Sequence, residues 1–480
     1  MKQNILIRKG ITLAVIVLFI GMSIVPSTGT TVEEKSTMSS SYDGNTLYVG
    51  GSGPGNYSKI QDAIDNVSDG DTVFVYDDSS PYIENVVVNK ELSLLGENQS
   101  STIIDGGGIS HVILVRSNYV EISDFTIQNC VNAFGFAGIF IQFADFCCIS
   151  NNTILNSSEW PHISSDGIQI LSGNDNIIDG NKIVHTWDGI SLYYAYNNMI
   201  TNNTFIDHIH GVFIYGTNHD NTIQYNIFEQ SDNNAILIEM KPEMRIESLQ
   251  IHNNTMSGNY SPISGGFEAI TSYTNCDNIS IIDNEINEFG TAIWIGGNNG
   301  IIANNIIDNC KRAIILREES TSLTISHNTF RKGDIGINLG GSNHVVSYNI
   351  FQGVGTGVYP LGANNIIMRN QFEENKVGFH VILEFDTGKV MQNNFINNTR
   401  DILFFQLLPI RRHRPLNPIF TNNYYDSWDG DGPQRIIGGA VVFAIPFILP
   451  IFPYFFWIPI PIPWLYFDWH PAREPYDIGV

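Results

Sequence analysis

A six-residue pattern, apolar–polar–x–Asn–x–apolar, recurs through most of the chain, and Ile200–Phe205 is a representative copy. Neighbouring copies lie 21–23 residues apart, with occasional longer steps of 28–30. Taking one asparagine per copy, the pattern falls at Asn152, Asn181, Asn203, Asn226, Asn254, Asn284, Asn305, Asn328, Asn349, Asn370, Asn393 and Asn423. A unit this short cannot bury its own apolar face, so successive copies must stack on one another. The sequence therefore predicts a solenoid.

Strands, and not helices, are indicated for the coils of this solenoid. The copies are short, rich in Ile, Phe, Val, Thr and Asn, and lack the 3.6-residue spacing of a helix. A second apolar segment follows each copy, as in Gly167–Ile170 and Gly189–Leu192. A coil with three short strands is typical of a parallel β-helix, which rises ~4.8 Å per coil. We therefore predict an all-β chain in which the asparagines form a ladder, each amide bonding to the next.

The repeats resemble those of the pectin-lyase-like superfamily, in particular its carbohydrate-binding and sugar-hydrolase repeats, which also occur in NosD-type periplasmic copper proteins. The resemblance covers residues 45–435 and implies a single-stranded right-handed parallel β-helix, with three short strands per coil and about twelve or more coils. This scaffold carries lyases, hydrolases, epimerases, adhesins and binding proteins, so the resemblance implies no single activity. Neither the Asp-Pro-His-Asp motif of uronan epimerases nor the Gly-His-Gly motif of polygalacturonases is present.

The two ends of the predicted coil should be covered. Residues 58–67 are expected to form a short amphipathic helix over the N-terminal end, because Ser58–Gln61 has the spacing of a capping box. Residues 436–480 are apolar and rich in proline, which favours an extended hairpin or flap over the last coil. A membrane- or partner-facing surface through residues 440–467 is the alternative.

The N-terminal sequence and the composition suggest a location. Residues 1–29 combine a basic start with an apolar core, which is typical of an export signal or an N-terminal anchor, and residues 30–44 form a polar leader. A formal net charge of -24 disfavours binding of nucleic acid. The five cysteines lack metal-site spacing and are expected to be free thiols. We predict an extracellular, cell-surface monomer, anchored to the membrane if the N-terminal segment is retained.

One column of the second strand carries the candidate catalytic residues. Asp166, Asp188 and His210 each precede a glycine at intervals of 22 residues, and Glu268 follows in the same column. Adjacent carboxyl groups would titrate together, and paired carboxylates are what acid–base cleavage of a glycosidic bond requires. The alternative is that these Asp-Gly pairs form ordinary turns, in which the aspartate caps the local backbone.

Two outward columns of the same strand carry candidate substrate-binding residues. They include aromatic rings that can stack against sugar rings and charged groups that can hydrogen-bond to them. These residues are Tyr193, Phe213, Tyr215, Glu239, Tyr273, Trp294 and Arg317. Stacking between neighbouring coils, without a ligand, is the alternative role for the rings.

Calcium and copper are the cofactors to consider, and no metal ligand is assigned. No dense aspartate cluster marks a calcium site, whereas His185, His208 and His210 fall in neighbouring coils and could bind copper if they converge. The sequence favours a cell-surface protein that binds polysaccharide or envelope glycan, with hydrolase or lyase activity left open. The alternatives are a structural adhesin or envelope protein and a NosD-like, metal-associated periplasmic protein.

Overall fold

The computed structural model describes residues 44–155, 164–231, 233–239, 245–259, 267–382, 388–408, 419–447 and 456–479. From Gly44 on, the chain forms one compact unit. The expectations for residues 1–29 and for nearly all of the leader lie outside the described residues.

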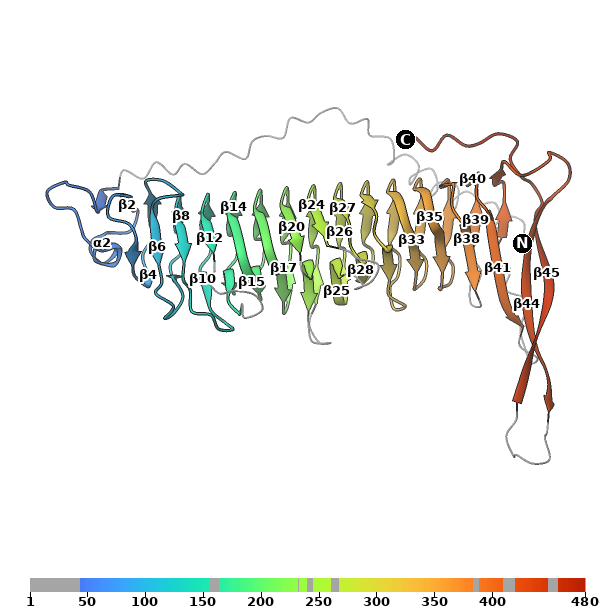
Figure 1. Ribbon diagram of the computed structural model, residues 1–480, viewed down its shortest axis with the longest axis horizontal. Coiled ribbons are helices and arrows are strands. Elements are labelled where there is room, and N and C mark those ends of the chain that lie inside the picture. Colours follow the sequence, from blue (N-terminus) through green and yellow to red (C-terminus); the bar gives the residue numbers. More distant parts are fainter. Residues whose placement is uncertain are drawn as a thin grey trace, which may run out of the picture. The chain divides into compact units, whose positions relative to one another are not determined.

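Short parallel strands stack into a rod, with the helix α2 (Ile60–Asn66) at one end and a long hairpin at the other (Figure 1). One sheet, sheet A, has sixteen strands, and each pairs with the equivalent strand of the next coil. Its strands are β1 (Thr46–Val49), β2 (Asp71–Val75), β5 (Leu92–Gly96), β8 (Glu121–Ser123), β11 (Cys148–Ser150), β14 (Ile177–Asp179), β16 (Met199–Thr201), β19 (Thr222–Gln224), β23 (Gln250–His252), β26 (Ser280–Ile282), β29 (Ile301–Ala303), β32 (Thr324–Ser326), β34 (Val345–Ser347), β36 (Ile366–Met368), β39 (Lys389–Met391) and β42 (Ile419–Thr421). The predicted parallel β-helix is confirmed.

The remaining strands follow sheet A in each coil and form sheet B. In the N-terminal half they are β3 (Tyr82–Ile83), β4 (Val86–Val88), β6 (Ile103–Asp105), β7 (Ile113–Val115), β9 (Thr126–Gln128), β10 (Ala137–Gln142), β12 (Thr153–Leu155), β13 (Asp166–Leu171), β15 (Lys182–Tyr193), β17 (Thr204–Tyr215), β20 (Ile227–Ser231) and β21 (Asn234–Glu239). In the C-terminal half they are β24 (Thr255–Gly258), β25 (Glu268–Asp277), β27 (Glu285–Asn287), β28 (Thr291–Gly296), β30 (Ile306–Asp308), β31 (Arg312–Leu316), β33 (Thr329–Leu339), β35 (Ile350–Pro360), β37 (Gln371–Glu373), β38 (Val377–Ile382), β40 (Asn394–Ile396), β41 (Ile402–Leu408), β43 (Tyr424–Tyr425), β44 (Gln434–Phe447) and β45 (Phe456–Asp468). A minor pair, β18 (Asn218–His219) and β22 (Ile246–Glu247), lies in the turns.

The expectation of three separate strands per coil needs one correction. In β15, β17, β33 and β35 the second and third strands run on as one. The corner between them is a single residue with positive φ, such as His185 (φ 59) or Asp207 (φ 55). One such residue turns the chain without ending the ladder of backbone hydrogen bonds, and spacing alone does not reveal this.

The asparagine ladder is confirmed from Asn152 to Asn423. Within it, the side-chain nitrogen of Asn203 donates to the side-chain oxygen of Asn226 at 3.1 Å and to the carbonyl oxygen of Ile178 at 2.8 Å. The backbone N–H of Asn203 donates to the same oxygen of Asn226 at 2.9 Å. Buried amides are tolerated because each finds hydrogen-bond partners in the neighbouring coils. The ladder ends at the buried carboxylate of Asp468, which accepts from the backbone and side-chain nitrogens of Asn423, both at 3.0 Å.

A stack of aromatic rings fills the core beside this ladder. Phe330, Phe351, Phe372, Phe395 and Tyr425 lie in successive coils, with ring centroids 4.8–5.2 Å apart and nearly parallel planes. All five side chains are buried. Offset stacking adds to the free energy gained by burying these rings. The apolar last position of the repeat is therefore a core position.

Helix α2 covers the N-terminal end, but it is not capped as predicted. Lys59 is the N-cap residue and makes no capping hydrogen bond with its side chain. Instead, the carboxylate of Glu84 accepts the backbone N–H groups of Ile60 and Gln61 at 2.9 and 3.0 Å. The side chain of Gln61 pairs with the exposed edge of β4, accepting from the N–H of Val87 at 2.8 Å. The helix thereby closes both the core and a strand edge.

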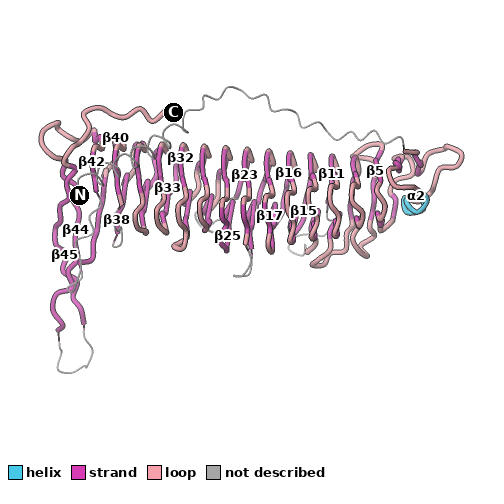
Figure 2. The backbone as a smooth tube through the Cα atoms, turned by 180° about the vertical axis from the view of Figure 1, so that it is seen from behind, coloured by secondary structure: helices cyan, strands magenta, loops and turns pink. Residues whose placement is uncertain are grey.

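The C-terminal region contains the antiparallel hairpin β44–β45. Residues Phe405–Leu408 of β41 pair in parallel with Gly439–Val442, which joins the hairpin to the last coil. The base of the hairpin lies against the last coil, where Ile436 is buried in the core, and both strands then continue beyond the rod (Figure 2). After β45 the chain returns to the rod, where the N–H and carbonyl groups of Tyr476 bond to the side chain of Asn394.

Candidate functional site

Asp166, Asp188 and His210 lie in one column on neighbouring strands of sheet B. The glycine after each aspartate is required by close packing and not by a turn. A Cβ atom on Gly189 would lie 2.5 Å from the carbonyl oxygen of Gly211. The Asp-Gly pairs are therefore strand residues, and the turn interpretation is wrong.

Two short hydrogen bonds fix the side chains of this column. Nδ1 of His210 lies 2.7 Å from Oδ1 of Asp188. The hydroxyl of Ser191 donates to Oδ2 of Asp166 at 2.6 Å. Both aspartates are buried, with 7% of Asp166 and 3% of Asp188 exposed. The predicted pair thus comes together, but beneath the surface of the rod.

Burial drives the members of this cluster toward their uncharged forms. It raises the pKa of Asp166 and of Asp188 well above the usual range of a carboxyl group. The charge of Asp188 raises the pKa of Asp166 further, and the charge of Glu239 does so for Asp188. Burial also lowers the pKa of His210 to about 4. A carboxyl group with a raised pKa can hold a proton near neutral pH, as a general acid must.

Aromatic rings continue from this cluster across the outer face of sheet B. His210 stacks on Phe213 at 5.9 Å between ring centroids, and Phe213 lies 5.9 Å from Tyr193 and 6.3 Å from Tyr215. The rings of Tyr193 and Tyr215 are 5.8 Å apart. The structure therefore brings together three of the predicted binding residues, and Glu239 follows Tyr215 in the next strand.

Four other predicted residues lie further along the rod. Glu268 is two coils beyond His210, and Asn234 lies between them. Tyr273 and Trp294 form a pair of their own, 5.7 Å apart. Trp294 continues the column of Thr271, whereas the column of Tyr273 is interrupted toward β28, because the register shifts between Thr271 and Asn275.

Arg317 therefore does not continue the column of Tyr215 and Glu239 through Tyr273. Its side chain pairs with Glu319 at 2.6 Å and lies against the backbone of Gly296.

Two rings of the site were not predicted from the sequence. Trp187 contacts His210 edge-on at 6.4 Å, and Phe134 contacts Trp187 edge-on at 5.1 Å. Phe134 lies in the loop before β10, two strands away from β15, and 70% of its surface is exposed. A loop residue that reaches across two coils leaves no periodic signal. Trp187 could have been noticed, because it directly precedes Asp188.

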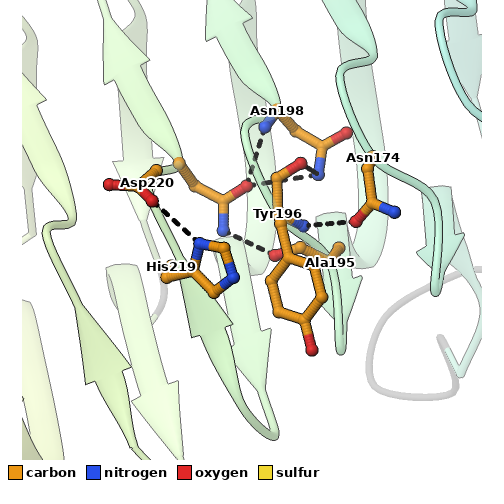
Figure 3. A network of polar contacts seen from close by, with 7 residues as sticks. Asn174, Ala195, Tyr196, Asn198, His219 and Asp220 are labelled. Carbon is orange, nitrogen blue, oxygen red and sulfur yellow. Dashed lines mark hydrogen bonds and ion pairs between the residues drawn. The ribbon is translucent and has the colours of Figure 1, made fainter.

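The turn after β17 adds a second aromatic contact beside the site. Tyr196 and His219 stack at 4.1 Å between ring centroids, and Nδ1 of His219 pairs with Asp220 at 2.8 Å (Figure 3). The backbone N–H of Tyr196 donates to the side chain of Asn174, which fixes the turn. These contacts stack Tyr196 on a ring of the next coil.

The histidines do not converge on a metal. His185 pairs with Asp207, and His210 pairs with Asp188. His208 is buried against the rings of Phe205 and Phe228. Among the residues that the structure describes, no group of three or more His, Cys, Asp or Glu side chains is placed to hold a metal ion. All five cysteines are free thiols, as expected.

Two family descriptions match the sequence. "Right handed beta helix region" matches residues 110–286, and "Periplasmic copper-binding protein (NosD)" matches residues 245–404. The four histidines in the second range are separate: His344 bonds to the carbonyl oxygen of Gly340, and His252, His327 and His380 contact the rings of Tyr225, Tyr348 and Tyr359. The described residues therefore do not fit a copper site.

A relative and two solved structures are also similar. A "Cell surface glycoprotein" of Methanothermus fervidus is 31% identical over 295 residues, covering 59% of this chain and 46% of that protein. The chain thus spans about half the length of this curated relative. An alginate lyase from a Paenibacillus species is 12% identical, with a TM-score of 0.40 over 60% of this chain and 95% of the other. A DFA-IIIase from Arthrobacter chlorophenolicus, without its lid, is 14% identical, with a TM-score of 0.45 over 68% and 94%.

Proposed function

Since the chain belongs to the right-handed parallel β-helix repeat proteins, we propose that it is a cell-surface protein that binds a neutral polysaccharide along sheet B. The binding surface is the aromatic path, defined as Phe134, Trp187, His210, Phe213, Tyr215 and Tyr193. The observation that carries the proposal is that these rings are continuous across the neighbouring strands β15 and β17 and the loop before β10.

The chemistry of the path suits a sugar chain. Flat rings with an exposed face can stack against the apolar faces of sugar rings, and they lose little conformational entropy on binding. Glu239 is exposed beside Tyr215 and can accept hydrogen bonds from sugar hydroxyls. A rod with coils about 4.8 Å apart offers contacts repeated along its length, as a polymer requires.

Charge and location narrow the ligand further. A formal net charge of -24 opposes binding of polyuronates and other polyanions, which leaves neutral polysaccharides as the favoured class. The name of the Methanothermus fervidus relative, a cell surface glycoprotein, supports a place at the cell surface for this chain too.

Cleavage of the bound glycan, with Asp166 and Asp188 as the acid–base pair, is the second candidate function. The raised pKa values of both carboxyl groups favour it. Their burial opposes it, because a catalytic group must come within about 3 Å of the reacting atom, and little of either aspartate is exposed. Binding without cleavage is therefore the function that the geometry supports best.

Affinity electrophoresis in gels containing neutral glucans, mannans or fructans tests binding. Phe134→Ala should weaken retention by about two- to tenfold, because one stacked ring contributes roughly 0.5–1.5 kcal/mol. Phe143→Ala is the matched control, since Phe143 is 67% exposed but lies in the turn after β10. Equal retention of both variants, or retention only by a polyuronate such as alginate, would contradict the proposal.

Analysis of reducing ends after incubation with a retained glycan separates the two functions. Binding alone predicts that no new reducing ends form with the wild-type protein or with Asp188→Asn. New ends that disappear in Asp188→Asn, with retention and folding unchanged, would establish the cleavage function instead.

A further inference from the structure

The sequence from β44 to β45 contains the longest uncharged segment of the chain. Residues 436–467 include no charged residue and no His, Asn, Gln, Ser or Thr. Arg435 and Asp468 mark its two ends and lie near each other at the base, where Arg435 pairs with Phe467 and Gln434 with Asp468. Both strands of the hairpin therefore change from charged to apolar sequence at its base.

The outer edge of β45 lacks backbone donors. Pro459, Pro461 and Pro463 occupy every second position, opposite Phe443, Val441 and Gly439. Pairing with β44 continues through these positions, so the missing N–H groups belong to the side of β45 that faces away from β44. This edge cannot donate to an added strand, and it costs less to remove from water than an ordinary strand edge. The prolines thus disfavour a β-strand of another protein as the partner.

The composition also argues against a protein groove. Protein interfaces surround an apolar centre with a polar rim, whereas apolar residues here occupy both the odd and the even positions of β45. Trp457, Trp464 and Tyr466 provide most of the polar atoms among its side chains, and these residue types are enriched at membrane–water interfaces. An apolar solvent with a polar boundary fits this composition better than a folded partner does.

The hairpin is positioned to reach a surface. It leaves the C-terminal end of the rod and continues beyond the edge of the coils (Figure 1). Beyond the part that pairs with β41, residues 443–447 of β44 would extend about 16 Å at 3.3 Å per residue. Two strands alone leave carbonyl groups without partners, which lipid does not tolerate at depth. The backbone therefore favours a position in the boundary between headgroups and acyl chains.

From these observations we propose that the β44–β45 hairpin binds the surface of a lipid membrane. Its paired strands lie in the interfacial layer, and the acidic rod remains in water. This proposal is independent of the polysaccharide proposal, because it uses no residue of the aromatic path. None of the helices among the described residues is long and apolar enough to cross a membrane.

The test uses the full chain and vesicles of phosphatidylcholine. Hydrogen exchange should slow in peptides from residues 434–447 and 456–468 when vesicles are added, while exchange in the coils stays unchanged. This local readout does not depend on residues 1–43. High salt should leave the protection in place, because the contact is apolar and the formal net charge of the protein is -24.

Paired lysine substitutions provide the matched comparison. Ile460→Lys with Ile462→Lys should reduce protection and vesicle partitioning by roughly tenfold or more, because charged groups are costly in the apolar layer. Ile301→Lys with Ile306→Lys should bind vesicles as the wild type does, since these residues are 44% and 43% exposed on the rod. Circular dichroism checks that both variants keep the β-helix.

Two results would overturn the membrane proposal. One is the absence of vesicle-dependent protection in the hairpin, or protection that the hairpin lysines leave unchanged. The other is a concentration-dependent dimer that forms without vesicles and is lost in the hairpin variant, which would identify a second copy of the chain as the partner.

Discussion

Replacement of Asn203 by alanine should destabilise the middle of the rod by breaking the asparagine ladder. The side-chain oxygen of Asn203 accepts the backbone N–H of Asn181 at 2.9 Å and its side-chain N–H at 3.1 Å. The side-chain nitrogen of Asn203 donates to the carbonyl oxygen of Ile178 at 2.8 Å. Each buried polar group left without its partner costs ~1–3 kcal/mol. The backbone N–H of Asn181 and the carbonyl oxygen of Ile178 would both lose their partner, so we expect a loss of roughly 2–5 kcal/mol.

Urea unfolding followed by circular dichroism measures this loss. Because solenoids can unfold in parts, peptide-resolved hydrogen exchange should also show faster exchange in β14, β16 and β19. Asn202→Gly is the matched control: Asn202 is exposed with φ 54, and Gly180 occupies the equivalent position one coil earlier with φ 65. The control should change stability by less than ~0.5 kcal/mol. An equally small loss in Asn203→Ala would refute the view that the ladder stabilises the rod.

The other predictions concern the end of the ladder and the pH dependence of stability. Asp468→Ala removes the acceptor of both nitrogens of Asn423 and should cost about 2–4 kcal/mol of stability, with faster hydrogen exchange in β40 and β43. Asp468→Asn retains one acceptor oxygen and should lose less stability. Equal losses in the two variants would contradict the capping role of Asp468. Burial lowers the pKa of His344 to about 4, below its unfolded value of about 6.5, so its contribution to stability is present above pH 6.5 and is lost as the pH falls toward 4. Between pH 7 and pH 5 this loss amounts to about 2 kcal/mol. In urea titrations the stability of His344→Asn should therefore depend less on pH than that of the wild type, because asparagine does not titrate. The amide oxygen can still accept the N–H of Leu323, so the variant should fold. An unchanged dependence of stability on pH would contradict the role of His344.

Much of the architecture could be read from the sequence because stacking repeats a local rule. The spacing of the asparagines determined that Asn203 follows Asn181 and precedes Asn226 in the ladder, and the apolar position of each repeat determined the core. The same rule aligned Asp166, Asp188 and His210 in one column. Each of these relations joins equivalent positions of neighbouring coils, so spacing along the chain gives the neighbour in space.

Relations that leave this register could not be predicted. Phe134 reaches Trp187 across two strands from a loop, and a register shift between β25 and β28 ends the column at Tyr273. Glu84 caps helix α2 from a distant turn, where the local spacing had indicated Ser58.

The sequence alone therefore determined the repeating coil, the ladder within it and the column that holds the candidate site. Only the tertiary structure decided how deeply Asp188 is buried and which rings surround it. It also decided that the hairpin β44–β45 pairs with β41 of the last coil and then continues beyond it (Figure 1). The physical reason is that a periodic pattern encodes contacts between equivalent residues, whereas burial, bulges and loop contacts depend on the packing of the whole chain.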